Sequence, residues 1–159
     1  MITCSTDKRI RAASIIINND SVLLIYRKRE GKEYYVFPGG GVEKNETIEQ
    51  AVLRELFEET SLKAEIDRLL YVHKYDNNSE QYFYLLKNHL GEPKLHEKSI
   101  EAERNSENNF YEPLWVNLTK LNELTLYPLE IKAWFVDDVK NNFTNCPKKQ
   151  FIKISERLD

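Results

Sequence analysis

The chain contains few of the residues that mark disulfide-stapled or zinc-binding proteins. Only two of its 159 residues are cysteine, and these two, Cys4 and Cys146, lie near opposite ends. They form no C-x-x-C pair, and no histidine follows either one at the spacing of a zinc site. The sequence therefore excludes a disulfide framework, and two free thiols are favoured over a single disulfide bond.

Long hydrophobic runs are also missing. The first residues, Met1 to Lys8, include no apolar stretch of signal-peptide length, and no segment approaches the length of a membrane span. The net charge of −3 gives no support for sequence-independent binding to nucleic acid. We therefore expect a cytoplasmic protein with no membrane or nucleic-acid partner, built as a single domain over residues 1–159.

The segment Gly40–Leu62 carries the strongest pattern in the chain, and it predicts an amphipathic helix that follows a glycine loop. Thr47 is expected to be the N-cap, with Gln50 three residues later completing a capping box. Apolar side chains then recur at four-residue steps, which predicts one buried helix face. These apolar positions are Ile48, Val52 and Leu56.

Three carboxylates of this helix, Glu55, Glu58 and Glu59, are expected on one strip of its surface, because successive residues turn by about 100°. Such acids repel one another, and near a helix C-terminus the macrodipole disfavours them further. A hard cation removes both penalties, since Mg²⁺ prefers oxygen ligands. A Glu-x-x-Glu-Glu pattern alone is most often a solvated helix face, so the metal hypothesis depends on the residues around it.

Those surrounding residues give the pattern G-x5-E-x7-R-E-U-x-E-E-x-G-U, where U is aliphatic, and this resembles the signature of the Nudix hydrolase family. Gly40, Glu46 and Arg54 stand at the first fixed positions, ahead of the three acids, and Leu62 ends the match. One position departs, because Ser61 stands where the family has glycine. A glycine there suits a left-handed helix end, so serine is expected to cost about 1 kcal/mol or to bend the helix exit.

The resemblance implies roles for the residues of the box, with Mg²⁺ or Mn²⁺ as the cofactor. Glu58 and Glu59 would be metal ligands together with the carbonyl of Gly40, and Glu55 would be a ligand or a general base. Arg54 would orient a glutamate through charge-assisted hydrogen bonds. Glu46 would support the junction between loop and helix.

The implied reaction is hydrolysis of a nucleoside diphosphate linked to another group, by attack of water on phosphorus. The substrate stays open among oxidised or ordinary nucleoside triphosphates, ADP-ribose, dinucleoside polyphosphates and nucleotide sugars, with a slight preference for a nucleoside triphosphate. A nucleotide-binding sensor or scaffold without catalysis is the alternative. An isopentenyl diphosphate isomerase is disfavoured because neither cysteine falls in an expected core strand. The partner is thus a small nucleotide, and a homodimer is left open.

The expected substrate-binding residues are Gly40, which opens the box, and Arg27, Gly39 and Tyr35, which lie outside it. Arg27 is the first of three consecutive basic residues at the end of an expected strand, Arg27-Lys28-Arg29. Arginine binds oxyanions in bidentate fashion. Tandem glycines let the backbone approach a ligand closely. Tyr35 or its neighbour Tyr34 would stack on a base, although a core role is the more common one for such tyrosines.

One further acid is expected to join the metal site from the polar region between Gly91 and Tyr111 or just beyond it. The resemblance implies that a glutamate from this part of the chain sometimes joins the metal site, and Glu112 fits that placement best, with Glu103 and Glu107 as alternatives. The region itself is weakly patterned and is expected to be a surface loop. The three histidines, His73, His89 and His96, have no metal-ligand spacing and are expected to be structural or solvated.

The rest of the chain predicts an α+β fold. Two apolar β-branched runs, residues 11–18 and 21–28, predict a hairpin that turns at Asn19-Asp20. Two long strands are expected after the helix, followed by a short strand, a helical turn, a last helix and an edge strand. Their expected ranges are residues 62–75, 80–89, 114–116, 119–124, 128–141 and 151–154. The Nudix resemblance implies an α/β/α sandwich around a central mixed β-sheet.

Overall fold

The structure is a computed structural model that describes residues 8–96, 102 and 104–157. The longer helices are α1 (Ile48–Thr60) and α3 (Leu129–Asp138), and short 3-10 helices occur at η1 (Leu118–Glu123), η2 (Val139–Asn141) and η3 (Ile154–Glu156). The strands are β1 (Arg9–Ile15), β2 (Ile17–Asn18), β3 (Ser21–Arg29), β4 (Lys32–Val36), β5 (Gly39–Gly41), β6 (Lys63–Tyr75), β7 (Ser79–Leu90), β8 (Asn109–Asn117), β9 (Leu126–Tyr127) and β10 (Lys148–Ile152).

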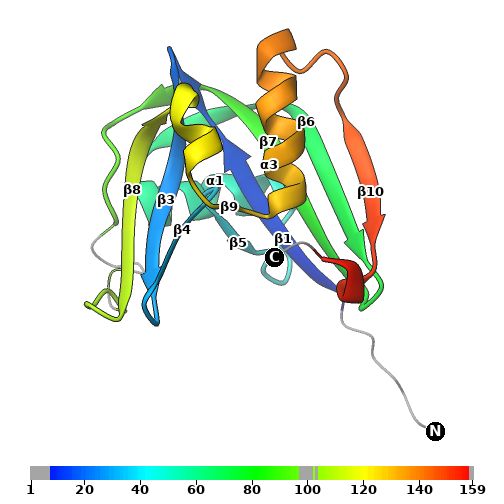
Figure 1. Cartoon of the computed structure of the whole chain (residues 1–159), viewed down its shortest axis with the longest axis horizontal. Coiled ribbons are helices and arrows are strands. Elements are labelled where there is room, and N and C mark those ends of the chain that lie inside the picture. The colour runs from blue at the N-terminus through cyan, green and yellow to red at the C-terminus, as the bar shows by residue number, and fades with distance from the viewer. Residues whose placement is uncertain (1–7, 97–101, 103, 158–159) are drawn as a thin grey trace, which may run out of the picture.

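Hydrogen bonding divides these strands into two mixed sheets (Figure 1). The first sheet has the order β10-β6-β7-β1-β5, and the second has the order β2-β3-β4-β9 with β8 paired to β3. In the first sheet, β1 runs parallel to β7 and antiparallel to β5. The central β layer that we expected is therefore present, but it consists of two sheets that open away from each other at one end.

The two helices cover opposite sides of this β layer (Figure 1). Neighbouring side chains of a strand point to opposite faces. Leu23 of β3 accordingly packs in the cluster that contains Val52 and Leu56 of α1, whereas Leu24 packs in the cluster that contains Phe135 of α3. Both faces of the layer are thus buried, and the predicted α/β/α sandwich of the α+β class is confirmed.

The first predicted strand is divided in the structure. Residues 11–18 form one apolar run in the sequence, but β1 ends at Ile15 in the first sheet and β2 begins at Ile17 in the second. Ile16 lies between them, and its carbonyl accepts a hydrogen bond from the N–H of Leu23 at 3.0 Å. The hairpin turn at Asn19-Asp20 is present, because Asn18 pairs with Ser21.

The strand β8 is longer than the sequence predicts. We expected residues 114–116, whereas Asn109 to Asn117 pair with β3 along its whole length. Part of the region expected to be a loop is therefore strand. The last helix ends at Asp138 and continues as the 3-10 helix η2, and β10 lies at the edge of its sheet, paired with β6.

The remaining expectations concern the cysteines, the histidines and membrane spans. Cys146 is a free thiol, and Cys4 lies outside the described residues. His73 is fully buried and packs edge-on against Trp134 at a centroid distance of 5.3 Å. Within the part of the chain that the structure describes, no helix is long and apolar enough to cross a membrane.

Candidate active site

The helix α1 begins where the capping box places it. Thr47 Oγ1 accepts a hydrogen bond from the N–H of Gln50 at 3.1 Å, and Gln50 Oε1 accepts one from the N–H of Thr47 at 2.9 Å. The two bonds satisfy donors that a helix N-terminus otherwise leaves unpaired. They also fix the rotation of the helix, and with it the directions in which its acids point.

Glu55 and Glu59 lie one turn apart on the buried side of α1, with only 8% and 7% of their surfaces exposed. Both contact the glycine strand β5. The N–H of Gly39 donates to Glu59 Oε2 at 3.4 Å. The Glu55 carboxylate occupies the space where a β-carbon of residue 40 would lie, so a larger residue at Gly40 would have to displace that carboxylate. The glycines and the acids of the box therefore form one packed unit.

Arg54 connects the loop to the acids of the helix. Its Nε and Nη2 donate to the two carboxylate oxygens of Glu46 at 2.7 and 3.0 Å, and Nη2 also donates to the carbonyl of Gly41 at 2.9 Å. Its Nη1 donates to Glu55 Oε1 at 2.8 Å and to Glu58 Oε2 at 3.2 Å. The hydrogen bond from Arg54 lowers the pKa of the Glu46 carboxyl below its ordinary value. Arg54 thus holds Glu46 ionised and fixes the position of Glu55.

A cavity of about 270 Å³ opens beside Glu55 and Glu59. Two arginines, Arg11 of β1 and Arg27 of β3, line it together with the two acids. The other lining residues are Ile25, Val36, Gly39, Gly40, Gly41 and Tyr111. Two buried carboxylates and two guanidinium groups thus line the same small cavity. Carboxylates suit a bound cation and guanidinium groups suit phosphate oxygens, so the cavity fits a ligand that carries both.

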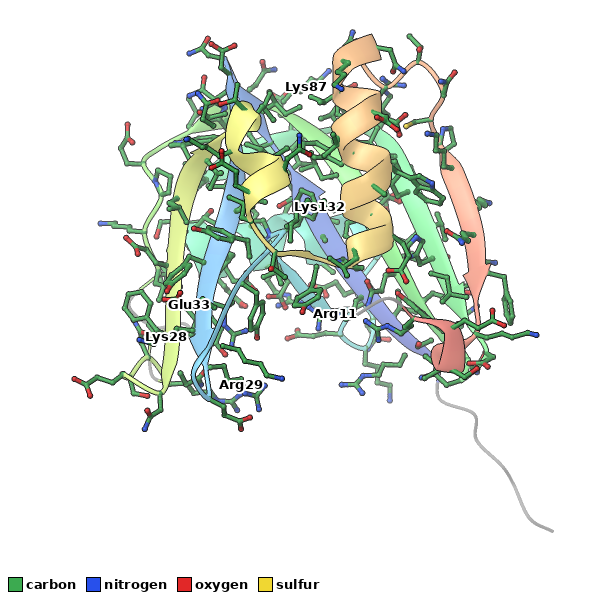
Figure 2. The ribbon with its side chains drawn as sticks, in the orientation of Figure 1. Arg11, Lys28, Arg29, Glu33, Lys87 and Lys132 are labelled. Atoms are coloured by element: carbon green, nitrogen blue, oxygen red, sulfur yellow. The ribbon has the colours of Figure 1, made fainter. Side chains whose placement is uncertain are left out.

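A second cavity of about 160 Å³ adjoins the first, because both are lined by Arg11 and Val36. Its walls also include the aromatic rings of Phe37, Phe83 and Tyr127 and the polar side chains of Gln81 and Arg157. Figure 2 shows Arg11 at the open end between the two sheets, with Lys28 and Arg29 at the tip of the β3–β4 hairpin. The site is therefore a pair of neighbouring cavities at the open end of the β layer.

The sequence-predicted site residues are only partly brought together. Gly39, Gly40, Glu55, Glu59 and Arg27 line the first cavity. Glu58 is half-buried and is held by Arg54 beside it. Among the described residues, no group of three or more His, Cys, Asp or Glu side chains is arranged to hold a metal ion.

Tyr35 is placed away from the cavity, contrary to our expectation. It pairs with Tyr26 across β3 and β4, and their ring centroids lie 5.4 Å apart. Tyr34 pairs with Arg27 and so shares the face that looks into the cavity. Paired residues of antiparallel strands point to the same face, so Tyr34 lies on the Arg27 side of the sheet, although it does not line the first cavity.

The further acid that we expected at the metal site, Glu112, does not line the cavity. Glu112 lies in β8 opposite Tyr26, on the face that looks away from Arg27, and it is exposed. Glu107 is exposed in the turn before β8, and Glu103 lies outside the described residues. The expectation that Glu112 completes the site is therefore not supported by its position, because the register of β8 with β3 turns its side chain outward.

Two residues of the site were missed in the sequence, Arg11 and Tyr111. Arg11 begins an apolar strand and has no local pattern that distinguishes it from a solvated strand end. Tyr111 belongs to the region that we expected to be a loop, although it alternates with Phe110 as a strand residue does. Both reach the cavity only through strand pairing between distant segments.

Ser61, the one departure from the box, adopts the left-handed conformation that the family glycine would take, with φ 61° and ψ 7°. Its N–H caps α1 by donating to the carbonyl of Phe57 at 2.9 Å. Its Oγ donates to the carbonyl of Lys94 at 2.7 Å. The helix exit is therefore retained, and the side-chain hydrogen bond offsets the strain that serine introduces.

The chain is similar to several known proteins in sequence and in fold. An RNA pyrophosphohydrolase from Pasteurella multocida is 41% identical over 61 residues, covering 38% of this chain and 31% of that protein. The match thus spans about a third of the length of this curated relative. A MutT NUDIX hydrolase from Burkholderia pseudomallei has a similar structure, with a TM-score of 0.60, 26% identity, and coverage of 78% of this chain and 94% of that one.

A mutator MutT protein from Bacillus halodurans shares the fold with a TM-score of 0.65 at 20% identity, over 95% of both chains. The family model for the NUDIX domain matches residues 8–139. That match covers most of the chain, including the glycine strand, the acids of α1 and the strands that line both cavities. The chain therefore belongs to the Nudix family.

Proposed function

We propose that this protein hydrolyses the pyrophosphate bond of a nucleoside diphosphate derivative, with water as the attacking group. The observation that carries the proposal is the pair of buried acids, Glu55 and Glu59, packed on a glycine strand in a cavity that two arginines also line. Arg54 already pairs with Glu55, and a second buried acid beside the same cavity is an arrangement that a bound cation would stabilise further.

The residues present fit a hard divalent cation, Mg²⁺ or Mn²⁺. Their side-chain donors are carboxylate oxygens, which such ions prefer, and the absence of a β-carbon at Gly40 leaves the Glu55 carboxylate close to the backbone. Glu55 and Glu58 already share one positively charged donor, because Arg54 Nη1 donates a hydrogen bond to each of them. We infer that Glu55, Glu58, Glu59 and the Gly40 carbonyl hold the metal. When bound, it would neutralise phosphate charge and acidify a water molecule.

The protein groups then divide the remaining tasks. Arg27 and Arg11 bind phosphate oxygens, since guanidinium groups match their geometry. Glu55, held by Arg54, would be the general base that accepts the proton of the attacking water in the alternative in which it is not a metal ligand. Gly39 and Gly40 line the same cavity, and the missing β-carbon of Gly40 leaves room for the Glu55 carboxylate. The second cavity, with its aromatic walls, houses the rest of the substrate, which we take to be a nucleoside.

A small nucleotide, such as an oxidised or ordinary nucleoside triphosphate, is the first candidate substrate, and a homodimer is compatible with it. The triphosphate end of an RNA is the second candidate. The curated relatives are named RNA pyrophosphohydrolases, and Lys28 and Arg29 are exposed at the tip of the hairpin that leads to Arg27. Exposed basic side chains beside the cavity suit the further phosphates of a longer chain.

A substrate panel tests the proposal. Ordinary and oxidised nucleoside triphosphates, ADP-ribose, dinucleoside polyphosphates, nucleotide sugars and a short RNA with a 5′-triphosphate are incubated with Mg²⁺ and with Mn²⁺, and the products are identified. Turnover of one class, abolished by a chelator, is expected. Binding of nucleotides with no turnover in any class would instead identify a sensor or scaffold and would contradict the proposal.

A further inference from the structure

We propose that Tyr111 is a positioning residue that holds the Arg27 guanidinium in place for a substrate phosphate, with Asn109 fixing the other side of the same group. The proposal rests on the function proposed above, in which Arg27 binds phosphate oxygens. It concerns two residues of β8 that the sequence does not single out and that form no part of the Nudix box.

The first observation is the stacking of Arg27 on Tyr111. The guanidinium carbon lies 3.6 Å from the centroid of the Tyr111 ring, at van der Waals contact with its face. Tyr34, on the opposite neighbouring strand, lies 5.8 Å from the same carbon. An aromatic face attracts a guanidinium plane, and the attraction is larger where water is excluded. The ring of Tyr111 therefore restricts Arg27 to one plane.

The second observation is the hydrogen bond that fixes the rotation of Arg27 within that plane. Its Nη2 donates to Asn109 Oδ1 at 3.0 Å, so the bonding partner is a neutral amide. The positive charge is therefore not cancelled by this contact. Nε is buried and has no hydrogen-bond partner among the described residues, and a guanidinium carries five N–H donors in all. Arg27 thus keeps both charge and donors for a ligand.

The third observation is that the backbone fixes this arrangement. Tyr111 pairs directly with Arg27 in the β3–β8 ladder, and Asn109 pairs with Arg29. The N–H of Tyr111 donates to Asn105 Oδ1 at 3.1 Å, which anchors the start of the strand. Both Tyr111 and Arg27 line the first cavity. A long, flexible side chain is therefore held in one orientation before substrate arrives, which reduces the entropy lost on binding.

Phe110 provides a matched control, because it is the next aromatic residue on the same strand but on the opposite face. It packs edge-on against Tyr26 at a centroid distance of 6.1 Å and does not line the cavity. Replacing Phe110 by leucine removes an aromatic ring from β8 without touching Arg27. Replacing Tyr111 by leucine removes the aromatic ring that stacks on Arg27, whereas Tyr111→Phe retains the face of that ring.

The test measures binding of inorganic pyrophosphate by calorimetry to the wild-type protein and to the three variants. Tyr111→Leu is expected to weaken binding roughly 10-fold, whereas Tyr111→Phe and Phe110→Leu stay within about threefold of wild type. With an active substrate, Tyr111→Leu raises KM more than it lowers kcat. In an Arg27→Gln background, Tyr111→Leu should have no further effect on binding, because the group that it positions is gone.

Equal losses of pyrophosphate binding in Tyr111→Leu and Phe110→Leu would overturn the proposal, and so would an undiminished effect of Tyr111→Leu in the Arg27→Gln background. Either result would show that β8 contributes only through stability. The binding measurement does not depend on turnover. A wild-type protein that binds pyrophosphate but hydrolyses none of the panel would therefore contradict the proposed function. The positioning of Arg27 by Tyr111 would still be tested by the binding of the variants.

Discussion

The Glu55 carboxylate fills the place where a β-carbon of Gly40 would lie. The glycine that opens the box is therefore required by an acid fifteen residues later in the chain (40 to 55), and not by an unusual backbone angle. A side chain at this position displaces the end of a flexible residue, so the fold can adjust although the carboxylate moves. Gly41, the next residue, has open space at the same point.

Gly40→Ala should accordingly keep the fold and lose activity. The added methyl group pushes the Glu55 carboxylate out of the cavity, and a displacement of this size costs catalysis about 100-fold. The measurement is kcat/KM on the best substrate of the panel, together with the thermal midpoint of unfolding. Gly41→Ala, whose added methyl group meets open space, is the comparison and should lose less activity than Gly40→Ala. Equal activity of the two variants would contradict the inferred role of the Gly40–Glu55 contact.

Arg54→Lys should lower both stability and activity. A lysine cannot reproduce the fork that bonds Glu46 on one side and Glu55 and Glu58 on the other. Leaving these partly buried acids under-bonded should reduce the free energy of unfolding by about 1–3 kcal/mol, measured by urea denaturation at pH 7. Lys120→Ala breaks only an exposed ion pair with Glu123, so it should change that free energy by less than about 0.5 kcal/mol. A similar result for both variants would argue against Arg54 as the connecting group.

The helix exit allows a test of the serine that replaces the family glycine. Ser61→Ala retains the left-handed strain and loses the hydrogen bond to Lys94, so it should destabilise the protein by about 1 kcal/mol. Ser61→Gly loses the same bond but removes the strain, and should stay within about 0.5 kcal/mol of wild type. Thermal denaturation ranks the three proteins. An alanine variant as stable as the glycine variant would show that the strain is absent.

Stability should fall between neutral and mildly acidic pH because of His73. Burial lowers the pKa of His73 to about 4 in the folded protein, whereas an unfolded histidine titrates near 6.5. The unfolded state therefore binds the proton first as the pH falls from about 6.5 to about 4, and the folded state loses stability across that window. The loss should be on the order of 1–2 kcal/mol between pH 7 and pH 5.

His73→Leu should remove that part of the pH dependence, since the imidazole is replaced by an apolar side chain among aromatic rings. Urea unfolding of both proteins at pH 7 and pH 5 gives the difference directly. His89 and His96 are retained in both proteins, so the two proteins differ only at residue 73. Parallel stability profiles for the two proteins would mean that His73 does not contribute.

Much of the site was predictable because it is encoded locally. The helix, its cap and the phase of its acids lie within one continuous segment, and a capping box and a four-residue apolar step depend only on neighbours along the chain. The contact of Gly40 with Glu55 joins two ends of that same segment. The box therefore determined the helix position and the location of the candidate site before any tertiary contact was known.

The positions of Tyr35 and Glu112 depend on pairing between distant strands. The choice between Tyr34 and Tyr35 depends on the register of β4 with β3, and the outward position of Glu112 depends on the register of β8 with β3. Because a shift of one residue turns every side chain to the other face, the sequence of one strand cannot settle these positions. The division of the first strand at Ile16 is likewise set by the two sheets that it joins.

The central claim is that the buried acids of α1 hold a divalent cation against a pyrophosphate, and the most direct test is the Mg²⁺-dependent turnover of Glu59→Gln. The amide has the same shape and can still accept the hydrogen bond from Gly39, so the thermal midpoint should be maintained. Glu49→Gln, the same change in the first turn of the helix, is the control and should retain activity. The account predicts that Glu59→Gln loses turnover by about 100-fold or more; wild-type turnover in that variant would contradict it.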